Sequence, residues 1–377
     1  MLAASSVRCN TDHEQLADRP RSVTTTSTAT GSGGFGGATG TGHTSTQSVT
    51  TGSGGTMQYV PDGADVLTLV HGLADAERIG LCLGRAADDG PTRFDSRPLP
   101  AGGLGYGESF TLSEAAELDF ENDALELIVL TGEFDADDDC SDTLERAYWP
   151  GRIQEPVPGV GAGGAAGAAG AGGAGFGGEG AVERPPLRAQ VLPTVPANSL
   201  VLGRHYVMVL AGCMGGPGVI DDGTYCGANF ASDAASLRTL LVPVSRAVQP
   251  GRLSFQFLHA AAATSQVDVR SVPNMFGSGV QVYLTSRVRF GIIAPKEPYL
   301  SHSTEELGIY DGAELVVSAS SGGELREHWR NLADDIEIAD ERSYLAILLG
   351  PRLGRGGAEG FNASRLMLLE TGLGRDE

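Results

Sequence analysis

Basic residues are scarce in this chain, and lysine is almost absent. The 377 residues include 26 lysines and arginines, of which only Lys296 is a lysine, against 47 acidic residues, and the net charge is −21. Such a surface repels nucleic-acid phosphates and anionic lipid headgroups, which excludes a nucleic-acid partner and a charge-driven membrane contact. The chain also lacks any apolar run of about 18 residues, which excludes a transmembrane helix.

Signatures of common enzymes are absent as well. No Gly-x-Ser-x-Gly nucleophile elbow occurs, and the glycine-rich segments lack the strand, helix and Lys of a phosphate-binding loop. His71 and His259 have no neighbouring His or Cys at metal-ligand spacing, and His205, His302 and His328 show none with one another. We therefore predict a protein that is not an enzyme, with no catalytic or cofactor-binding residues.

The chain does contain an internal repeat. Residues 66–83 and 253–270 share the order strand, His, small residue and second strand, with His71 eight residues before Ile79 and His259 eight before Val267. Later in each half, an apolar run leads from a Tyr to a Gly, at residues 206–212 and 344–350. Such matched self-similarity indicates two copies of one domain, at 64–248 and 249–377. We expect two separate cores, with each repeat His bonding loop backbone.

Short β-type runs dominate both copies. Leu253, Phe255 and Phe257 alternate with Ser254 and Gln256, as in a half-buried strand. About six or seven such runs per copy, without sustained helical periodicity, predict an all-β fold of two tandem antiparallel β-sandwiches, immunoglobulin-like or prealbumin-like. Residues 325–332 could add one or two helical turns.

Two low-complexity segments flank or interrupt these copies. Residues 1–63 contain a long Ser/Thr/Gly-rich stretch with almost nothing apolar to bury, so we predict a disordered tether. A Gly/Ala-rich stretch at 157–183 lies inside the first copy. Because the cost of closing a loop grows only logarithmically with its length, we expect a disordered insertion without chemistry.

The five cysteines are unevenly distributed. Cys9 precedes the tether, the second copy has none, and the other four lie in the first copy: Cys82, Cys140, Cys213 and Cys226. Four cysteines allow three pairings. Because Cys213 and Cys226 flank an insertion that the second copy lacks, we expect them to pair, which leaves Cys82 with Cys140. The alternative is a cytosolic protein with reduced thiols.

The first residues bear on where the protein resides. Small and apolar residues lead into Cys9 and then into the polar tether, which resembles the end of a bacterial lipoprotein signal. Arg8 stands where a small residue is usual, and a start codon upstream of Met1 would be needed to complete the leader. We expect an exported protein, anchored in the outer membrane through lipid on Cys9 or extracellular.

An acidic run in the first copy suggests a metal. Asp135, Asp137 and Asp139 have the alternating spacing that opens a calcium loop, but Cys140 and Arg146 occupy the places of the loop's Gly and bidentate Glu. Calcium is thus the one candidate cofactor, and a solvated acidic loop is the other interpretation. The same carboxylates, over residues 135–142, would serve an envelope-polymer hydrolase as the alternative function.

Four stretches of the second copy together resemble a known family. They are Leu258-His259-Ala260, Val267-Asp268-Val269 eight residues after that His, Phe290-Gly291 and the run from Tyr344 to Gly350, and they are similar to the bacterial domain-of-unknown-function family 4397. That resemblance implies tandem β-sandwiches on exported or cell-surface proteins, often lipoproteins, without established catalytic residues. The first copy departs from it at Gly80-Leu81-Cys82. We therefore expect a binding, adhesion or envelope-structural role, with a protein or glycan of the cell envelope as partner.

Overall fold

The computed structural model describes thirteen stretches of the chain: 66–85, 97–113, 124–135, 137–149, 187–197, 199–200, 204–215, 226–227, 236–274, 280–296, 300–332, 337–353 and 363–373. The predicted tether at 1–63, with Cys9, and the insertion at 157–183 lie outside these residues.

The first sandwich consists of two four-stranded sheets. Its outer sheet has the order β3-β2-β5-β6 and its inner sheet the order β4-β1-β7-β8. One short helix, α1 (Cys140–Arg146), follows β5. The strands are β1 (Val66–Leu73), β2 (Arg78–Arg85), β3 (Leu99–Gly105), β4 (Ser109–Ser113), β5 (Leu125–Thr131), β6 (Arg188–Val191), β7 (His205–Gly212) and β8 (Arg238–Val244).

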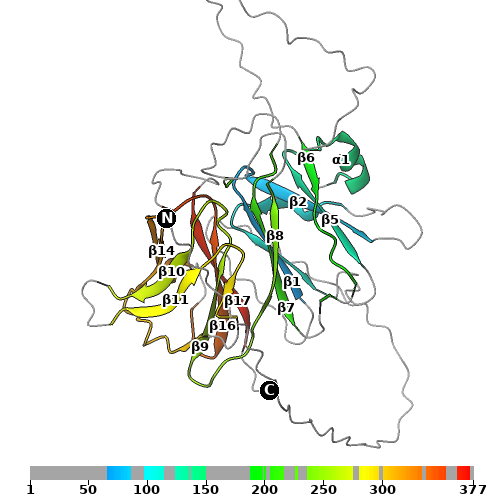
Figure 1. The fold of residues 1–377 in the computed structure, drawn as a ribbon. Coiled ribbons are helices and arrows are strands. Elements are labelled where there is room, and N and C mark those ends of the chain that lie inside the picture. Colours follow the sequence, from blue (N-terminus) through cyan, green and yellow to red (C-terminus); the bar gives the residue numbers. More distant parts are fainter. Residues whose placement is uncertain are drawn as a thin grey trace, which may run out of the picture. The chain divides into compact units, whose positions relative to one another are not determined.

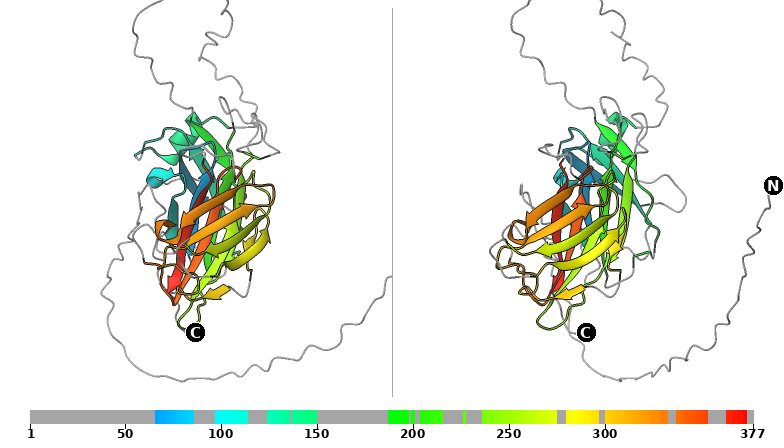
Figure 2. Two further views of the ribbon diagram at one scale, coloured as in Figure 1. Left: turned by 90° about the vertical axis from the view of Figure 1, so that its left-hand side faces the viewer. Right: turned by 60° about the vertical axis from the view of Figure 1, so that its left-hand side comes forward.

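The second sandwich repeats this plan. Its inner sheet has the order β12-β9-β16-β17, with β13 also pairing β9, and its outer sheet has the order β11-β10-β14-β15. Helix α2 (Trp329–Leu332) is a single turn. The strands are β9 (Leu253–His259), β10 (Val267–Val272), β11 (Val282–Val288), β12 (Ile293–Ala294), β13 (Leu300–His302), β14 (Glu314–Ala319), β15 (Glu324–His328), β16 (Arg342–Leu349) and β17 (Arg365–Leu373). The four sheets lie in layers (Figures 1 and 2).

The all-β fold predicted from the sequence is confirmed, with one parallel pair of strands in each inner sheet. Strand β1 runs parallel to β7, and β9 runs parallel to β16, whereas the other paired strands are antiparallel. Parallel neighbours need a crossover connection. Here the chain between the two parallel strands passes through the outer sheet. The alternation of polarity along single strands did not indicate that these strands would run parallel. Neither helix in the described part of the chain is long and apolar enough to cross a membrane.

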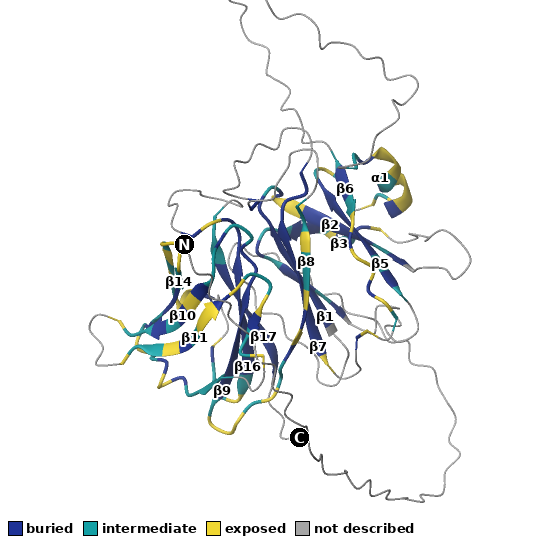
Figure 3. Cartoon of the chain, viewed as in Figure 1, coloured by how far each residue is buried: buried dark blue, intermediate teal, exposed yellow. Residues whose placement is uncertain are grey.

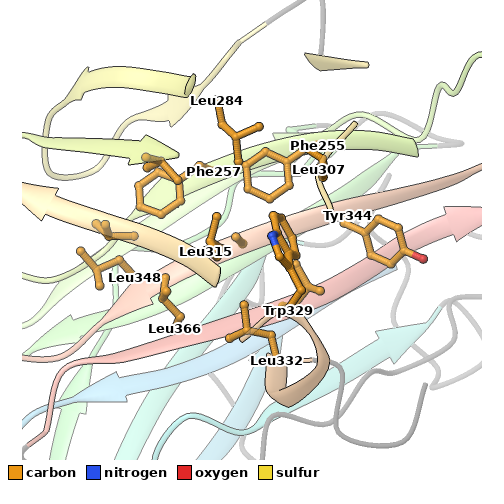
Figure 4. Packing of buried hydrophobic residues seen from close by; sticks show 14 of the residues in the cluster. Phe255, Phe257, Leu284, Leu307, Leu315, Trp329, Leu332, Tyr344, Leu348 and Leu366 are labelled. Carbon is orange, nitrogen blue, oxygen red and sulfur yellow. The ribbon is translucent and has the colours of Figure 1, made fainter. Parts of the chain in front are cut away.

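Each sandwich has an apolar core between its two sheets. In the second sandwich, Trp329 of α2 enters this core and donates from Nε1 to Ser271 Oγ at 2.9 Å. Its ring meets Phe255 edge to face at 5.7 Å between centroids. Figure 4 shows Trp329 among Phe255, Leu315 and Leu332. The helical turn that the sequence left open at 325–332 thus closes one side of the core.

A third apolar core lies between the two sandwiches, where the inner sheets face each other. The two separate cores expected from the sequence are present, and this third core, which the sequence did not indicate, joins them. Strand β7 is buried at every position and β16 at nearly every one, as Figure 3 shows for the central strands. Strands buried on both faces read as continuous apolar runs rather than alternating ones. The members of this core are Val70, Val207, Val209, Ala211, Val242, Val244, Leu258, Ala260, Ile293, Leu345, Ile347, Leu349, Met367 and Leu369.

Candidate functional site

The acidic run of the first sandwich forms the start of a helix. Asp139 is the N-cap of α1, and its Oδ1 accepts from the Ser141 backbone N–H at 2.7 Å. Asp142 lies in the first turn and Arg146 in the last, which suits the helix dipole at both ends. The alternation that suggested calcium is therefore, at Asp139, a helix-capping signal.

The neighbouring carboxylates have arginine partners. Asp137 lies 3.1 Å from Arg97, and Asp138 lies 2.5 Å from Arg146. The hydrogen bond from Arg146, followed by the one from the backbone of Asp135, lowers the pKa of Asp138. No group of three or more His, Cys, Asp or Glu side chains that could hold a metal occurs among the described residues, so Asp135, Asp137 and Asp139 are not gathered into a site. Calcium binding stays a prediction without support from this geometry.

A disulfide holds this acidic segment on the outer sheet. Cys82 of β2 and Cys140 of α1 are bonded, which is one of the two pairs expected from the sequence. Phe134 lies on Gly80, where a Cβ would come within 2.6 Å of the ring. Beneath lies a small apolar cluster that includes Ile128, Leu130 and Ala189. We call residues 133–135 and 137–146 the acidic cap, because most of its acidic side chains are exposed above this anchored base.

The second expected disulfide is also present, and a buried ion pair accompanies it. Cys213 is bonded to Cys226. Next to Cys213, Asp75 accepts from the backbone N–H groups of Met214 and Gly215 at 2.9 and 3.0 Å. Arg188 of β6 approaches Asp75 Oδ2 at 3.1 Å, and both side chains are only 7% exposed. The three segments are thus fastened together at one end of the first sandwich.

The two repeat histidines have equivalent structural roles. The Nδ1 atoms of His71 and His259 accept from the backbone N–H two residues later, at 3.2 and 3.3 Å. The N–H of Gly107 donates to the carbonyl of His71, and that of Gly291 to the carbonyl of His259, both at 2.8 Å. Burial lowers the pKa of His71 to about 3, against opposing contributions from backbone carbonyls, and it also lowers the pKa of His259. Both histidines therefore bond loop backbone, as predicted.

His205 is a buried polar residue whose position the sequence did not reveal. It opens β7 on the face toward the second sandwich, where its Nδ1 donates to the carbonyl of Thr371 at 3.4 Å and its Nε2 accepts from Thr68 Oγ1 at 2.8 Å. Burial, with a smaller contribution from nearby Arg246, lowers its pKa to about 3. A polar residue at the start of an otherwise apolar strand was the only available signal.

One hollow lies between two edge strands of the first sandwich. It has a volume of about 230 Å³ and is lined by Gln190, Val191, Pro193, Leu237, Arg238 and Thr239, from β6, β8 and their flanking residues. Arg238 is the one charged side chain of this lining, so the hollow itself supplies no carboxylate for acid–base chemistry. Of its apolar members, Leu237 packs against the core, whereas Val191 is exposed.

Comparison with known proteins gives two distant likenesses among solved structures. One is a candidate cell adhesion protein from Bacteroides uniformis, 9% identical over 81% of this chain and 96% of that chain, with a TM-score of 0.20. Another is the tip fimbrial protein Mfa3 from Porphyromonas gingivalis with C-terminal truncation, 7% identical over 82% of this chain and 99% of that chain, with a TM-score of 0.19. Both TM-scores are low, so neither likeness supports an inference about this chain.

No family model and no curated protein matches the sequence. The resemblance to family 4397 therefore stays a prediction.

Proposed function

We propose that the chain is an exported, surface-exposed β-sandwich protein with a binding, adhesion or envelope-structural role and no catalytic function. The observation that carries the proposal is the pair of disulfides, Cys82–Cys140 and Cys213–Cys226, both inside the first sandwich. Disulfides of this structural kind persist in oxidising compartments and are rare in a reducing cytosol. A lipid anchor on Cys9 is the more specific form of this proposal.

The acidic cap supports binding over hydrolysis. Asp137, Asp138 and Asp139 each have a partner within the protein, so none of the three is an unpartnered carboxylate for acid–base chemistry. The disulfide fixes the cap before any partner arrives, which reduces the entropy lost on binding. Loops and caps on a rigid scaffold are the usual places for recognition, so the cap is the first surface to test.

Location is tested on whole cells and on protein purified without reductant. We expect protease added outside intact cells to remove the chain, and we expect titration of the denatured, unreduced protein to find at most one free thiol, that of Cys9. Labelling with a radioactive fatty acid that is lost in Cys9→Ser would establish the anchor. Five free thiols would contradict export, and full protection from external protease would contradict exposure on the cell surface.

Binding is tested with beads that carry the purified chain and with isolated cell envelopes. We expect retention that falls at least threefold when Asp135, Asp142 and Glu145 are changed to their amides. The matched control changes Glu305, Asp311 and Glu337, three exposed acids of the second sandwich, and should retain binding. Periodate treatment of the envelopes distinguishes a glycan partner from a protein one. Release of soluble fragments from the envelopes would instead support the hydrolase.

A further inference from the structure

The core between the sandwiches is built from equivalent positions of the two copies. The alignment that matches His71 with His259 also matches Val70 with Leu258, and the one that matches Tyr206 with Tyr344 also matches Val209 with Ile347. All four of these apolar residues are buried in the shared core. The same alignment pairs two further positions on each side, which are Val207 with Leu345 and Ala211 with Leu349. Each copy therefore offers the same patch to the other.

The polar contacts at the rim of this core are also reciprocal. His205, one residue before Tyr206, donates to the carbonyl of Thr371 near the C-terminal end of β17. Ser343, one residue before Tyr344, donates through Oγ to the carbonyl of Ser245 just after β8, at 2.7 Å. The residue before the Tyr in each copy thus bonds the C-terminal end of the last strand in the other copy.

The aromatic-Gly turns follow the same rule. Tyr106 of the first copy donates through its hydroxyl to the carbonyl of Ala363, two residues before β17 begins, at 2.9 Å. Phe290, the equivalent residue of the second copy, packs against the shared core, and a Cβ on the next residue, Gly291, would lie 3.3 Å from Leu240 of β8. In each case the turn of one copy meets the last strand of the other.

Reciprocity of this kind defines a two-fold, isologous interface, in which residue i meets j and j meets i. We infer that the inner-sheet face of each sandwich is a self-complementary pairing surface, and that the partner it fits is a second copy of the same sandwich. The two copies of one chain satisfy each other, so the intact protein is an internal dimer.

The connection between the copies favours pairing within one chain. Strand β8 ends at Val244 and β9 begins at Leu253. Hydrogen bonds to β9 fix the connecting residues: the Ser245 N–H donates to Gln256 Oε1 at 2.8 Å, and Ser254 Oγ donates to the carbonyl of Ala247. A short, fixed connection gives the tethered partner a high effective concentration, which outcompetes a second chain.

A charge placed in the inner-sheet face of one sandwich should therefore separate the two sandwiches and expose the inner-sheet face of the other. In Val209→Asp, the first sandwich carries a charge in the centre of its face, and the intact face of the second sandwich becomes available to another chain. We expect light scattering after gel filtration to give twice the chain mass of 38.9 kDa at micromolar concentration, whereas the unaltered protein stays monomeric. The reciprocal variant Ile347→Asp should also dimerise, through the first sandwich.

The double variant Val209→Asp/Ile347→Asp is the matched control and should remain monomeric, because neither face is intact. Hydrogen exchange locates the contact: in the Val209→Asp dimer, β16 should keep its protection while β7 loses it. Monomeric elution of both single variants at every concentration overturns the inference. Equal self-association of the double variant overturns it as well, since the association would then be unspecific.

Discussion

Buried polar side chains fasten the points where this chain turns back on itself. Asp75 holds the segment after β7 in the first sandwich through two backbone N–H groups. At the corresponding place in the second sandwich, Thr264 accepts from the Leu353 N–H and donates to the carbonyl of Pro351. Asp75 and Thr264 both fix a loop through hydrogen bonds to its backbone. Only the Asp75 carboxylate needs a buried counter-charge, which Arg188 supplies.

Removing one member of that pair leaves the other charge buried without compensation. We expect Asp75→Ala to lower the free energy of unfolding by about 3 to 5 kcal/mol in urea titrations. Asp137→Ala, in an exposed pair with side chains 66% and 92% accessible, is the control and should cost about 0 to 1 kcal/mol. A loss below about 1 kcal/mol for Asp75→Ala would show that Arg188 finds solvent or another partner.

Buried histidines predict a loss of stability in mild acid. The pKa of His205 is about 3 in the folded chain and about 6.5 when unfolded, so only the unfolded chain takes up a proton between these values. Its contribution is complete above pH 6.5 and declines as pH falls toward 3. At pH 5 the loss is about 2 kcal/mol for this residue. His205→Gln should therefore show a smaller drop in unfolding free energy between pH 7.5 and pH 5 than the unaltered chain, and an equal drop would count against a neutral buried imidazole.

At the scale of elements, the outer sheets of the two copies carry different kinds of residue on the face that points away from the sandwich core. Cys82 of β2 corresponds to Arg270 of β10, and Ala189 of β6 corresponds to Glu324 of β15. The first face is small and apolar and is covered by the acidic cap. The second is exposed to water and carries a ladder of ion pairs, namely Arg270 with Glu324, Arg326 with Glu324 and Arg326 with Glu314. The residue types at a few positions of the outer sheet thus decide whether another segment packs on its outer face or the face stays in contact with water.

The cap depends on its disulfide. Helix α1 has seven residues, too few to be stable alone in water. We expect Cys82→Ala/Cys140→Ala to cost about 4 kcal/mol by the loop-entropy estimate and to abolish hydrogen-exchange protection in α1. Cys213→Ala/Cys226→Ala serves as the comparison and should leave protection of α1 intact. Persistence of that protection without Cys140 would mean that Phe134 and Leu144 suffice to hold the helix.

For the molecule as a whole, the core between the sandwiches joins what the repeat presents as separate domains. Val209 and Ile347 are fully buried although each lies on the side of its inner sheet that faces away from its own sandwich core. Neither sandwich can open this face to water without losing the burial of large apolar side chains.

We therefore expect one calorimetric transition for both sandwiches, with the calorimetric and van't Hoff enthalpies in agreement. The apolar surface exposed by unfolding either sandwich alone would destabilise the partly folded state. Two resolved transitions, or a van't Hoff enthalpy near half the calorimetric one, would show that the shared core contributes little coupling.

Much of the fold could be predicted because its signals are local. Alternation along Leu253, Phe255 and Phe257 indicates a strand, and the spacing of His71 and His259 indicates the duplication. The cysteine pairs could be predicted because Cys213 and Cys226 flank an insertion that the second copy lacks, which left Cys82 for Cys140. The arginine partners of Asp137 and Asp138 could not be foreseen, because Arg97 is distant in sequence and the helix cap at Asp139 uses the same residue types as a calcium loop.

By itself the sequence determined the all-β class, the repeated order of strands and the cysteines available for pairing, since these depend on residue type and short-range periodicity. Only the tertiary structure decided that β1 lies parallel to β7, that the acidic segment is a cap, and that the inner faces bury each other. These are contacts between segments far apart in the chain. An apolar run is the same in sequence whether its second face meets its own domain, a neighbour or a partner.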